Sequence, residues 1–362
     1  MRLGTCVGLG SLLVGAACSL AACGKTSRDA QGGVPATAGA GGILDASPGD
    51  DAAGAAGADN PDASGGVAGE GGEAGEGGEA GQTTNCVSNA PDLSALQVFP
   101  ADNAWNQDIS AFPVSAASDT YIQSIGADAT LGADFGSASG IPYNLVASDA
   151  EPSLVAFALD ATSDSGPYPL SAMSLIEPPP NARLLLVDPS AQLLYELSGA
   201  SNSVTGWAAT SGAIFNLASN MLRPDGWPSA DAAGLPIFAG LVRYDEAVTR
   251  GEIKHALRVT LTNTQSAHIT PATANGATLN PGYPPLGLRL RLSSSFDVSN
   301  FSPAARAILQ ALKTYGALVA DSGPNLRLSG APDACWDDAA LGELDLIKST
   351  DFQAVDTGPL AP

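Results

Sequence analysis

Apolar and polar residues alternate along much of the chain after residue 86, which predicts short β-strands. In the stretch 255–262, leucine and valine at 257, 259 and 261 alternate with arginine and threonine at 258, 260 and 262, and this period of two is that of a strand. Leu286–Leu292 repeats the pattern, and Arg183–Leu197 reads as a hairpin that turns at Asp188–Ala191. Further strand-like runs are Ser153–Leu159, Val204–Ala209, Leu235–Tyr244 and Asn325–Ser329.

Helical signals are few. Ser302 and Pro303 suit an N-cap and first turn of a helix that ends near Tyr315. Asp337–Lys348 has acids first and lysine last, as the helix dipole favours, and a short helix near Ser118–Ile125 is compatible with the pattern. We therefore expect a mainly β fold, an antiparallel β-sandwich or jelly roll with a few peripheral helices.

The first 22 residues have the composition of an export signal. Arg2 is followed by an apolar run, Val7–Ala22, which is short for a membrane-spanning helix. The run ends in Leu-Ala-Ala-Cys-Gly at 20–24, which resembles the lipobox of bacterial lipoproteins. The resemblance implies that Cys23 becomes the acylated first residue of the mature chain and anchors it to the lipid bilayer. An ordinary signal peptide cut near Ala22 is the alternative. Since Gly24 is not acidic, the outer membrane is the favoured location.

Residues 23–85 form the second predicted segment, an acidic linker that follows the lipidated cysteine. Gly, Ala, Asp, Glu, Ser, Thr and Pro dominate it, and no aromatic residue occurs there. Such a composition cannot bury enough apolar surface to offset chain entropy. We expect a disordered spacer that holds residues 86–362, a single β-rich domain, away from the membrane.

Cysteine counting predicts one disulfide. Cys6 and Cys18 lie in the signal segment and Cys23 in the lipobox, so Cys86 and Cys335 remain as a pair in an oxidising compartment. Two free buried thiols are the alternative.

Charge excludes whole classes of partner. The chain carries 15 Lys and Arg against 37 Asp and Glu, a net charge of −22. Such a surface repels phosphate backbones, so we expect no nucleic-acid partner and no polybasic attachment to membranes.

A series of motifs between 211 and 258 resembles a group of uncharacterised secreted bacterial proteins. The motifs are Ser-Gly-Ala-Ile-Phe from 211, Ser-Ala-Asp-Ala-Ala-Gly-Leu-Pro from 229, Arg-Tyr-Asp-Glu from 243 and His-Ala-Leu-Arg from 255. Ala311–Gly316 and Ala320–Gly323 have counterparts there too. The resemblance implies kinship over most of residues 97–356, but it does not indicate any enzymatic reaction.

Glycoside hydrolysis is the first chemistry that these motifs suggest. Asp231 and Glu246 lie on or beside turns, and two carboxyl groups of different pKa are the minimum for cleaving a glycosidic bond. Trp207, Trp227 and Tyr244 could stack on sugar rings. Against this, acids are numerous enough to meet by chance, and Asp231 could simply cap a short helix.

A polysaccharide lyase is the second hypothesis. His255 or Tyr244 would move the proton, while Arg243 or Arg258 neutralises a uronate carboxylate. The competing interpretation of His255 is a histidine paired with a core carboxylate.

No cofactor motif is present. The sequence has no phosphate loop, no dinucleotide fingerprint and no metal-ligand spacing, and it shows no legible calcium loop. We therefore expect an exported lipoprotein whose domain binds or cleaves polysaccharide, or a non-catalytic module that binds glycan or protein. The sequence does not indicate the oligomeric state.

Overall fold

The computed structural model describes residues 86–148 and 150–361. The signal segment, Cys23 and the linker lie outside the described residues. Strands outnumber helices in this part of the chain, so the predicted mainly β character is confirmed. None of the described helices has both the length and the apolar character needed to cross a membrane.

A six-stranded sheet forms the centre of the larger hydrophobic core. Its strands run in the order β1-β16-β11-β15-β14-β17. The pairs β1·β16 and β11·β15 are parallel, so this sheet is mixed, whereas the sequence pattern predicted antiparallel pairing. The strands are β1 (Gly132–Ala133), β11 (Leu257–Leu261), β14 (Arg289–Leu292), β15 (Ala317–Ser322), β16 (Arg327–Leu328) and β17 (Phe352–Val355).

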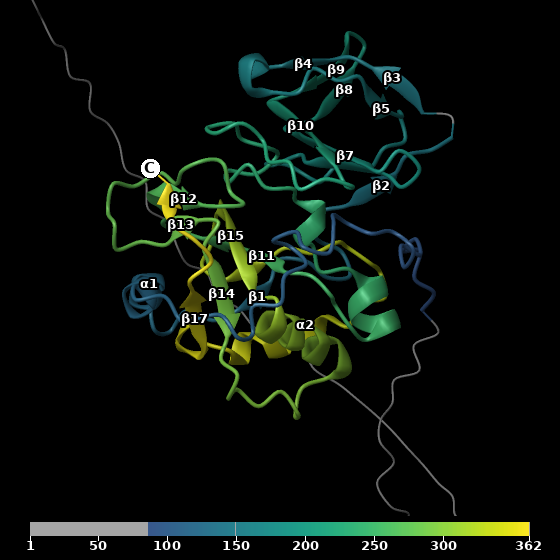
Figure 1. Cartoon of the computed structure of the whole chain (residues 1–362). Coiled ribbons are helices and arrows are strands. Elements are labelled where there is room, and N and C mark those ends of the chain that lie inside the picture. The colour runs from purple at the N-terminus through teal and green to yellow at the C-terminus, as the bar shows by residue number, and fades with distance from the viewer. Residues whose placement is uncertain (1–85, 149, 362) are drawn as a thin grey trace, which may run out of the picture. The chain divides into compact units, whose positions relative to one another are not determined.

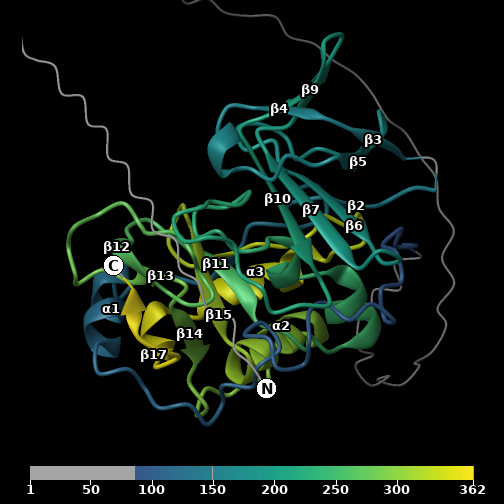
Figure 2. The same ribbon diagram turned by 45° about the horizontal axis from the view of Figure 1, so that its top comes forward.

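The helices lie beside this sheet in both ribbon views (Figure 1, Figure 2). α1 (Ser118–Ile125) and α2 (Pro303–Thr314) occupy the positions that the sequence predicted, α2 with its proline in the first turn. The predicted helix 337–348 is shorter: α3 (Asp338–Gly342), capped by Asp337, continues as the 3₁₀ turn η4 (Glu343–Leu346). Other turns of helix are η1 (Asp160–Thr162), η2 (Phe238–Gly240), the π-helical η3 (Asp245–Arg250) and η5 (Ser349–Asp351).

A second sheet is buried on both faces. In β6 (Leu184–Asp188), Leu185 and Val187 belong to the larger core, while Leu184 and Leu186 pack into a smaller cluster with Tyr168. Alternate residues point to opposite faces of a strand, so this sheet separates the two clusters. Its order is β10-β7-β6-β2, with β2 (Tyr143–Leu145), β7 (Leu193–Ser198) and β10 (Ser211–Asn216).

Small strand pairs cover the smaller cluster, above β10 and β7 in Figure 1. They are β3 (Glu151–Ser153) with β5 (Tyr168–Leu170), and β4 (Val155–Phe157) with β9 (Gly206–Ala209) and β8 (Ser201–Ser203). A separate sheet joins β12 (Gln265–Ile269) to β13 (Pro285–Leu286) and β18 (Leu360–Ala361).

The predicted disulfide is confirmed. Cys86 and Cys335 are bonded across a sequence separation of 249 residues, with their Cα atoms 5.5 Å apart. The bond therefore joins the start of the described chain to the loop that precedes α3.

The alternating stretch 255–262 is a strand, but both of its faces are buried. All five residues of β11 are buried. Leu257, Val259 and Leu261 pack in the larger core, and on the other face Arg258 is covered by its partners Asp231 and Ser329. Arg289 and Arg291 on β14 are buried in the same way and donate to backbone carbonyls of Ala104 and Ile109. The arginines at the polar positions of these two alternating stretches are thus buried in the protein, not exposed to solvent.

Candidate functional site

Glu246 is the centre of a buried ion-pair network, which we call the Glu246 network. Its Oε1 lies 2.6 Å from Arg243 Nη2, and its Oε2 lies 3.0 Å from His255 Nε2. Asp245 of the same π-helical turn is also buried and pairs with the partly exposed Arg250, whose Nη2 lies 3.4 Å from Glu246 Oε1 as well. The side chain of Glu246 is only 6% exposed, so its charge is balanced inside the protein.

The network holds Glu246 as a carboxylate. Burial alone would raise its pKa, but the positive charges of Arg243 and then His255 outweigh burial and lower the pKa to about 2. His255 Nδ1 lies 2.8 Å from the carbonyl oxygen of Ala256, so both ring nitrogens have partners. His255 is thus paired with a buried carboxylate, that of Glu246, as the alternative to a catalytic role supposed.

Glu246→Gln should lower the free energy of unfolding by about 3 kcal/mol at pH 7, because Arg243 loses its buried counter-charge and His255 loses its carboxylate partner. The folded pKa lies below the ordinary value, so this stabilisation is present above about pH 4.5 and is lost as the pH falls towards 2. Urea unfolding at several pH values should show the wild-type and variant curves converging below pH 4.5.

The exposed pair of Glu252 with Lys254 provides the matched control. Glu252→Gln should change the free energy of unfolding by less than about 0.5 kcal/mol at every pH. A Glu246→Gln deficit that stays constant down to pH 2.5 would contradict the assignment of a depressed pKa.

Asp231 belongs to a different buried set, the Asp231 network. Its Oδ1 accepts hydrogen bonds from Ser229 Oγ and from the backbone N–H groups of Ala233 and Leu235. Its Oδ2 lies 3.2 Å from Arg258 Nη2. The Asp231 side chain is 0% exposed, so the carboxylate holds the 229–235 turn and orients Arg258.

Asp321 is the second carboxylate of this network, and the sequence analysis did not propose it. Its Oδ2 lies 3.7 Å from the same Nη2 of Arg258 and 3.0 Å from Nη2 of Arg183. Two oxygens that close to one nitrogen are within about 7 Å of each other. The signal that could have found Asp321 is an acid at the end of the apolar run Ala317–Ala320.

Burial raises the pKa of Asp231 to about 6; Arg258 opposes this shift and Asp321 adds to it. No ion pair or hydrogen bond of the described residues joins the Asp231 network to Glu246. The proposed acid/base pair of Asp231 and Glu246 is therefore divided between two networks, and each carboxylate is occupied by protein donors.

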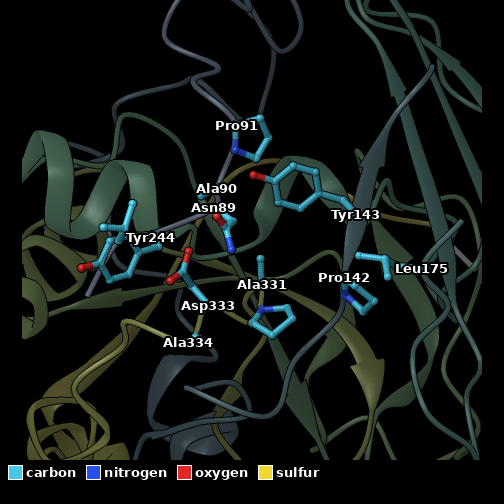
Figure 3. A pocket seen from close by; sticks show the side chains of 12 residues that line it. Asn89, Ala90, Pro91, Pro142, Tyr143, Leu175, Tyr244, Ala331, Asp333 and Ala334 are labelled. Carbon is cyan, nitrogen blue, oxygen red and sulfur yellow. The ribbon is translucent and has the colours of Figure 1, made fainter. Parts of the chain in front are cut away.

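A cavity of about 230 Å³, the Tyr pocket, lies near the Glu246 network (Figure 3). Tyr143 and Tyr244 lie on opposite sides of it, with Asn89 and Asp333 between them. Its remaining wall is apolar and is made by Val87, Ala90, Pro91, Pro142, Leu175, Ala331, Pro332 and Ala334.

The two tyrosines are held from behind. Tyr143 packs edge-on against Phe238 at 5.1 Å between ring centroids, and Tyr244 against Trp336 at 5.1 Å. Arg243 of the Glu246 network lies over the Phe238 ring. Burial raises the pKa of both tyrosines, so their hydroxyl groups stay protonated at neutral pH and can donate as well as accept.

Asp333 has capacity left for a ligand. Its Oδ2 accepts from Ser88 Oγ and its Oδ1 from the backbone N–H of Cys335. An ionised carboxylate offers about four lone-pair sites, so roughly two remain. Of the proposed site residues, only Tyr244 lines this pocket.

The two tryptophans proposed as sugar platforms lie elsewhere. Trp207 is on β9 and packs against the smaller cluster, and Trp227 lies beside the guanidinium of Arg223. Neither lines the Tyr pocket.

In the described part of the chain, no three His, Cys, Asp or Glu side chains are grouped so that they could hold a metal ion. Comparison of the sequence and the structure with known protein families, with curated proteins and with solved structures found no match.

Proposed function

We propose that the domain is a non-catalytic module that binds a glycan in the Tyr pocket. One observation carries the proposal: two tyrosine rings on opposite sides of one cavity, with a carboxylate and an amide between them (Figure 3). The apolar faces of a sugar ring pack on aromatic rings, and its hydroxyl groups bond to carboxylate and amide groups. At about 230 Å³, the cavity is smaller than typical drug-sized sites, which suits one or two sugar units.

Access to the carboxylates favours binding over cleavage. Asp333 is the one acidic residue that lines the Tyr pocket. Asp231 lines a separate cavity of about 250 Å³ together with Asp321, but its side chain is 0% exposed and is held by protein donors. Glu246 is 6% exposed and is paired with Arg243 and His255, so the proposed pair of Asp231 and Glu246 does not flank one substrate site. Cleavage by paired carboxylates needs two that flank the bond, which weakens the hydrolase hypothesis.

The lyase hypothesis is weaker for a related reason. A general base needs an atom free to take a proton from substrate. Both nitrogens of His255 are bonded within the protein, and Arg243 is committed to Glu246. Tyr244 does line the pocket, but its raised pKa favours the neutral form.

We also propose that the protein is exported and anchored to the bilayer by acylated Cys23, in the outer membrane. The lipobox-like sequence and the glycine-rich acidic segment after it support this proposal. For the domain we propose a β-sandwich, supported by the smaller cluster between the β10-β7-β6-β2 sheet and the small strand pairs.

A glycan array, followed by calorimetry on each positive sugar, tests the function. Tyr244→Ala should weaken affinity about tenfold, because it removes one ring of the site. Asp333→Asn should weaken binding by a similar factor while keeping the pocket volume. Tyr283→Ala, a tyrosine outside the Tyr pocket, should leave affinity unchanged.

Reducing ends should stay constant during incubation with each bound polysaccharide. Their steady release would favour hydrolysis instead. An array without any positive glycan would remove the proposal.

A further inference from the structure

We propose that a second cavity, the Trp105 pocket, binds a small uncharged aromatic molecule that carries a hydroxyl group. The cavity has a volume of about 210 Å³ and shares no lining residue with the Tyr pocket. Phe99 and Trp105 of the 99–105 segment and Phe215 of β10 all line it. The other lining residues are Asp102, Asn103, Ala104, Asn220, Met221, Leu222, Arg223, Gly234, Leu235, Pro236, Thr270 and Pro271.

The backbone at Phe99 is strained, and its neighbours hold it there. Phe99 has φ of 67°, a conformation that bulky residues rarely adopt. Its carbonyl oxygen accepts from Gln97 Nε2 at 2.8 Å and from Asn106 Nδ2 at 3.3 Å. Asn106 Nδ2 also donates to the carbonyl oxygens on either side, those of Val98 and Pro100. These hydrogen bonds hold Phe99 in this conformation, and Phe99 forms part of the wall of the cavity.

The mouth of the Trp105 pocket is apolar on one side. Met221 and Leu222 line it and are 78% and 46% exposed, although most large apolar side chains of the domain are buried. Methionine is a flexible, polarisable side chain that adapts to different ligand shapes. Exposed apolar side chains around an apolar cavity are typical of a small-molecule site.

The polar residues decide the charge of the ligand. Arg223 donates to Asp164, to Pro228 O and to Thr162 O, so all three of its guanidinium nitrogens have partners in the protein. An anionic ligand therefore finds no unpaired cation among the residues that line this cavity, and the carboxylate of Asp102 repels it.

The same carboxylate offers an acceptor to a hydroxyl group. Asp102 Oδ1 accepts from Asn220 Nδ2 at 2.9 Å, and Asn220 Oδ1 in turn accepts from Asn103 Nδ2 at 2.9 Å. This chain orients Asp102 at the mouth and leaves its Oδ2 without a hydrogen-bond partner among the described side chains. Since an apolar cavity of about 150 Å³ holds benzene, this cavity has room for a benzene ring with a hydroxyl substituent.

Titration of the full chain with benzyl alcohol, toluene and benzoate tests the proposal, by calorimetry and tryptophan emission. Benzyl alcohol should bind saturably, and toluene and benzoate about tenfold more weakly. Asp102→Asn should reduce the difference in affinity between benzyl alcohol and benzoate, because it removes the repulsion between the Asp102 carboxylate and the benzoate anion. Equal affinity for benzyl alcohol and benzoate would overturn the charge argument.

Ala104→Leu places a larger side chain in the cavity and should lower the affinity for benzyl alcohol at least about tenfold. The matched control is Ala111→Leu, at an exposed position on the same segment but outside the cavity. This variant should bind benzyl alcohol with the affinity of the wild type. Absence of saturable binding of all three probes, or normal binding by a folded Ala104→Leu variant, would overturn the proposal. The glycan array tests the Tyr pocket and the three aromatic probes test the Trp105 pocket, so either proposal can be refuted without affecting the other.

Discussion

Replacing both Cys86 and Cys335 by serine should lower the free energy of unfolding by about 5 kcal/mol, the value that the chain-entropy model gives for so long a loop. The bond closes a loop of 249 residues, and without it the unfolded chain regains that freedom. Urea unfolding of the double variant, and of the wild type under reductant, should give the same loss. A loss confined to the reduced wild type would point to an effect of the reductant.

The same change should weaken glycan binding at least about tenfold while the core remains folded. Val87, Asn89, Ala90 and Pro91 form one wall of the Tyr pocket. In the described structure this wall is fastened to the 331–335 loop by the disulfide and by the hydrogen bond from Ser88 to Asp333.

Ser88→Ala distinguishes the contribution of the hydrogen bond from that of the disulfide, because it removes the hydrogen bond to Asp333 and keeps the disulfide. Its affinity should fall only a few fold. Native affinity in the cysteine-free protein, measured where its near-UV circular dichroism is native, would show that the wall does not need the disulfide.

Arg258→Met should lower the free energy of unfolding by about 3–5 kcal/mol. The substitution leaves Asp231 without its cation in a site where Asp231 is 0% and Arg258 1% exposed. The loss should be smaller at pH 5 than at pH 8. Without Arg258, burial and Asp321 raise the pKa of Asp231 further, so the group becomes neutral at acidic pH.

Arg327→Met is the matched control, since Arg327 pairs with Asp345 and the two side chains are 36% and 62% exposed. Its effect should be about 1 kcal/mol or less, because solvent screens the pair. Asp231→Asn combined with Arg258→Met should recover much of the loss, because it removes the buried charge while the amide oxygen still accepts from the N–H of Leu235. Equal losses for the two single arginine variants would contradict the role of burial.

The parts of the fold that were predictable depend on local chemistry. The hairpin β6–β7 forms where it was expected, because Asp188 Oδ1 accepts from the backbone N–H groups of Ser190 and Ala191 within its own turn. Pro303 starts α2 and Asp337 caps α3 for equally local reasons. Such interactions join residues a few positions apart, so the sequence pattern contains them.

The run Leu235–Tyr244 shows where local pattern fails. It was predicted as a strand, yet it forms the 3₁₀ turn η2 and buried loops. Glu196 of β7 accepts from the backbone N–H groups of Ile237 and Phe238, and this contact holds the start of η2. The partner lies about forty positions away, so the pattern of the run itself could not reveal it.

The candidate site divides in the same way. Tyr244, Arg243, Glu246 and His255 are near one another in sequence, and the structure brings them to the same region. Tyr143, Asn89 and Asp333 come from other segments and were missed, since only long-range packing brings them to the Tyr pocket. Asp321 of β15 was missed for the same reason, but it belongs to the separate Asp231 network.

By itself, the sequence determined the β-rich character of residues 86–361, the main helices and the pairing of Cys86 with Cys335. Periodicity, capping residues and the small number of cysteines are enough for these features. Only the tertiary structure decided which arginine neutralises which acid and which aromatic rings line a cavity. Burial raises the free energy of an unpaired charge, so each carboxylate takes the cation that long-range packing places beside it.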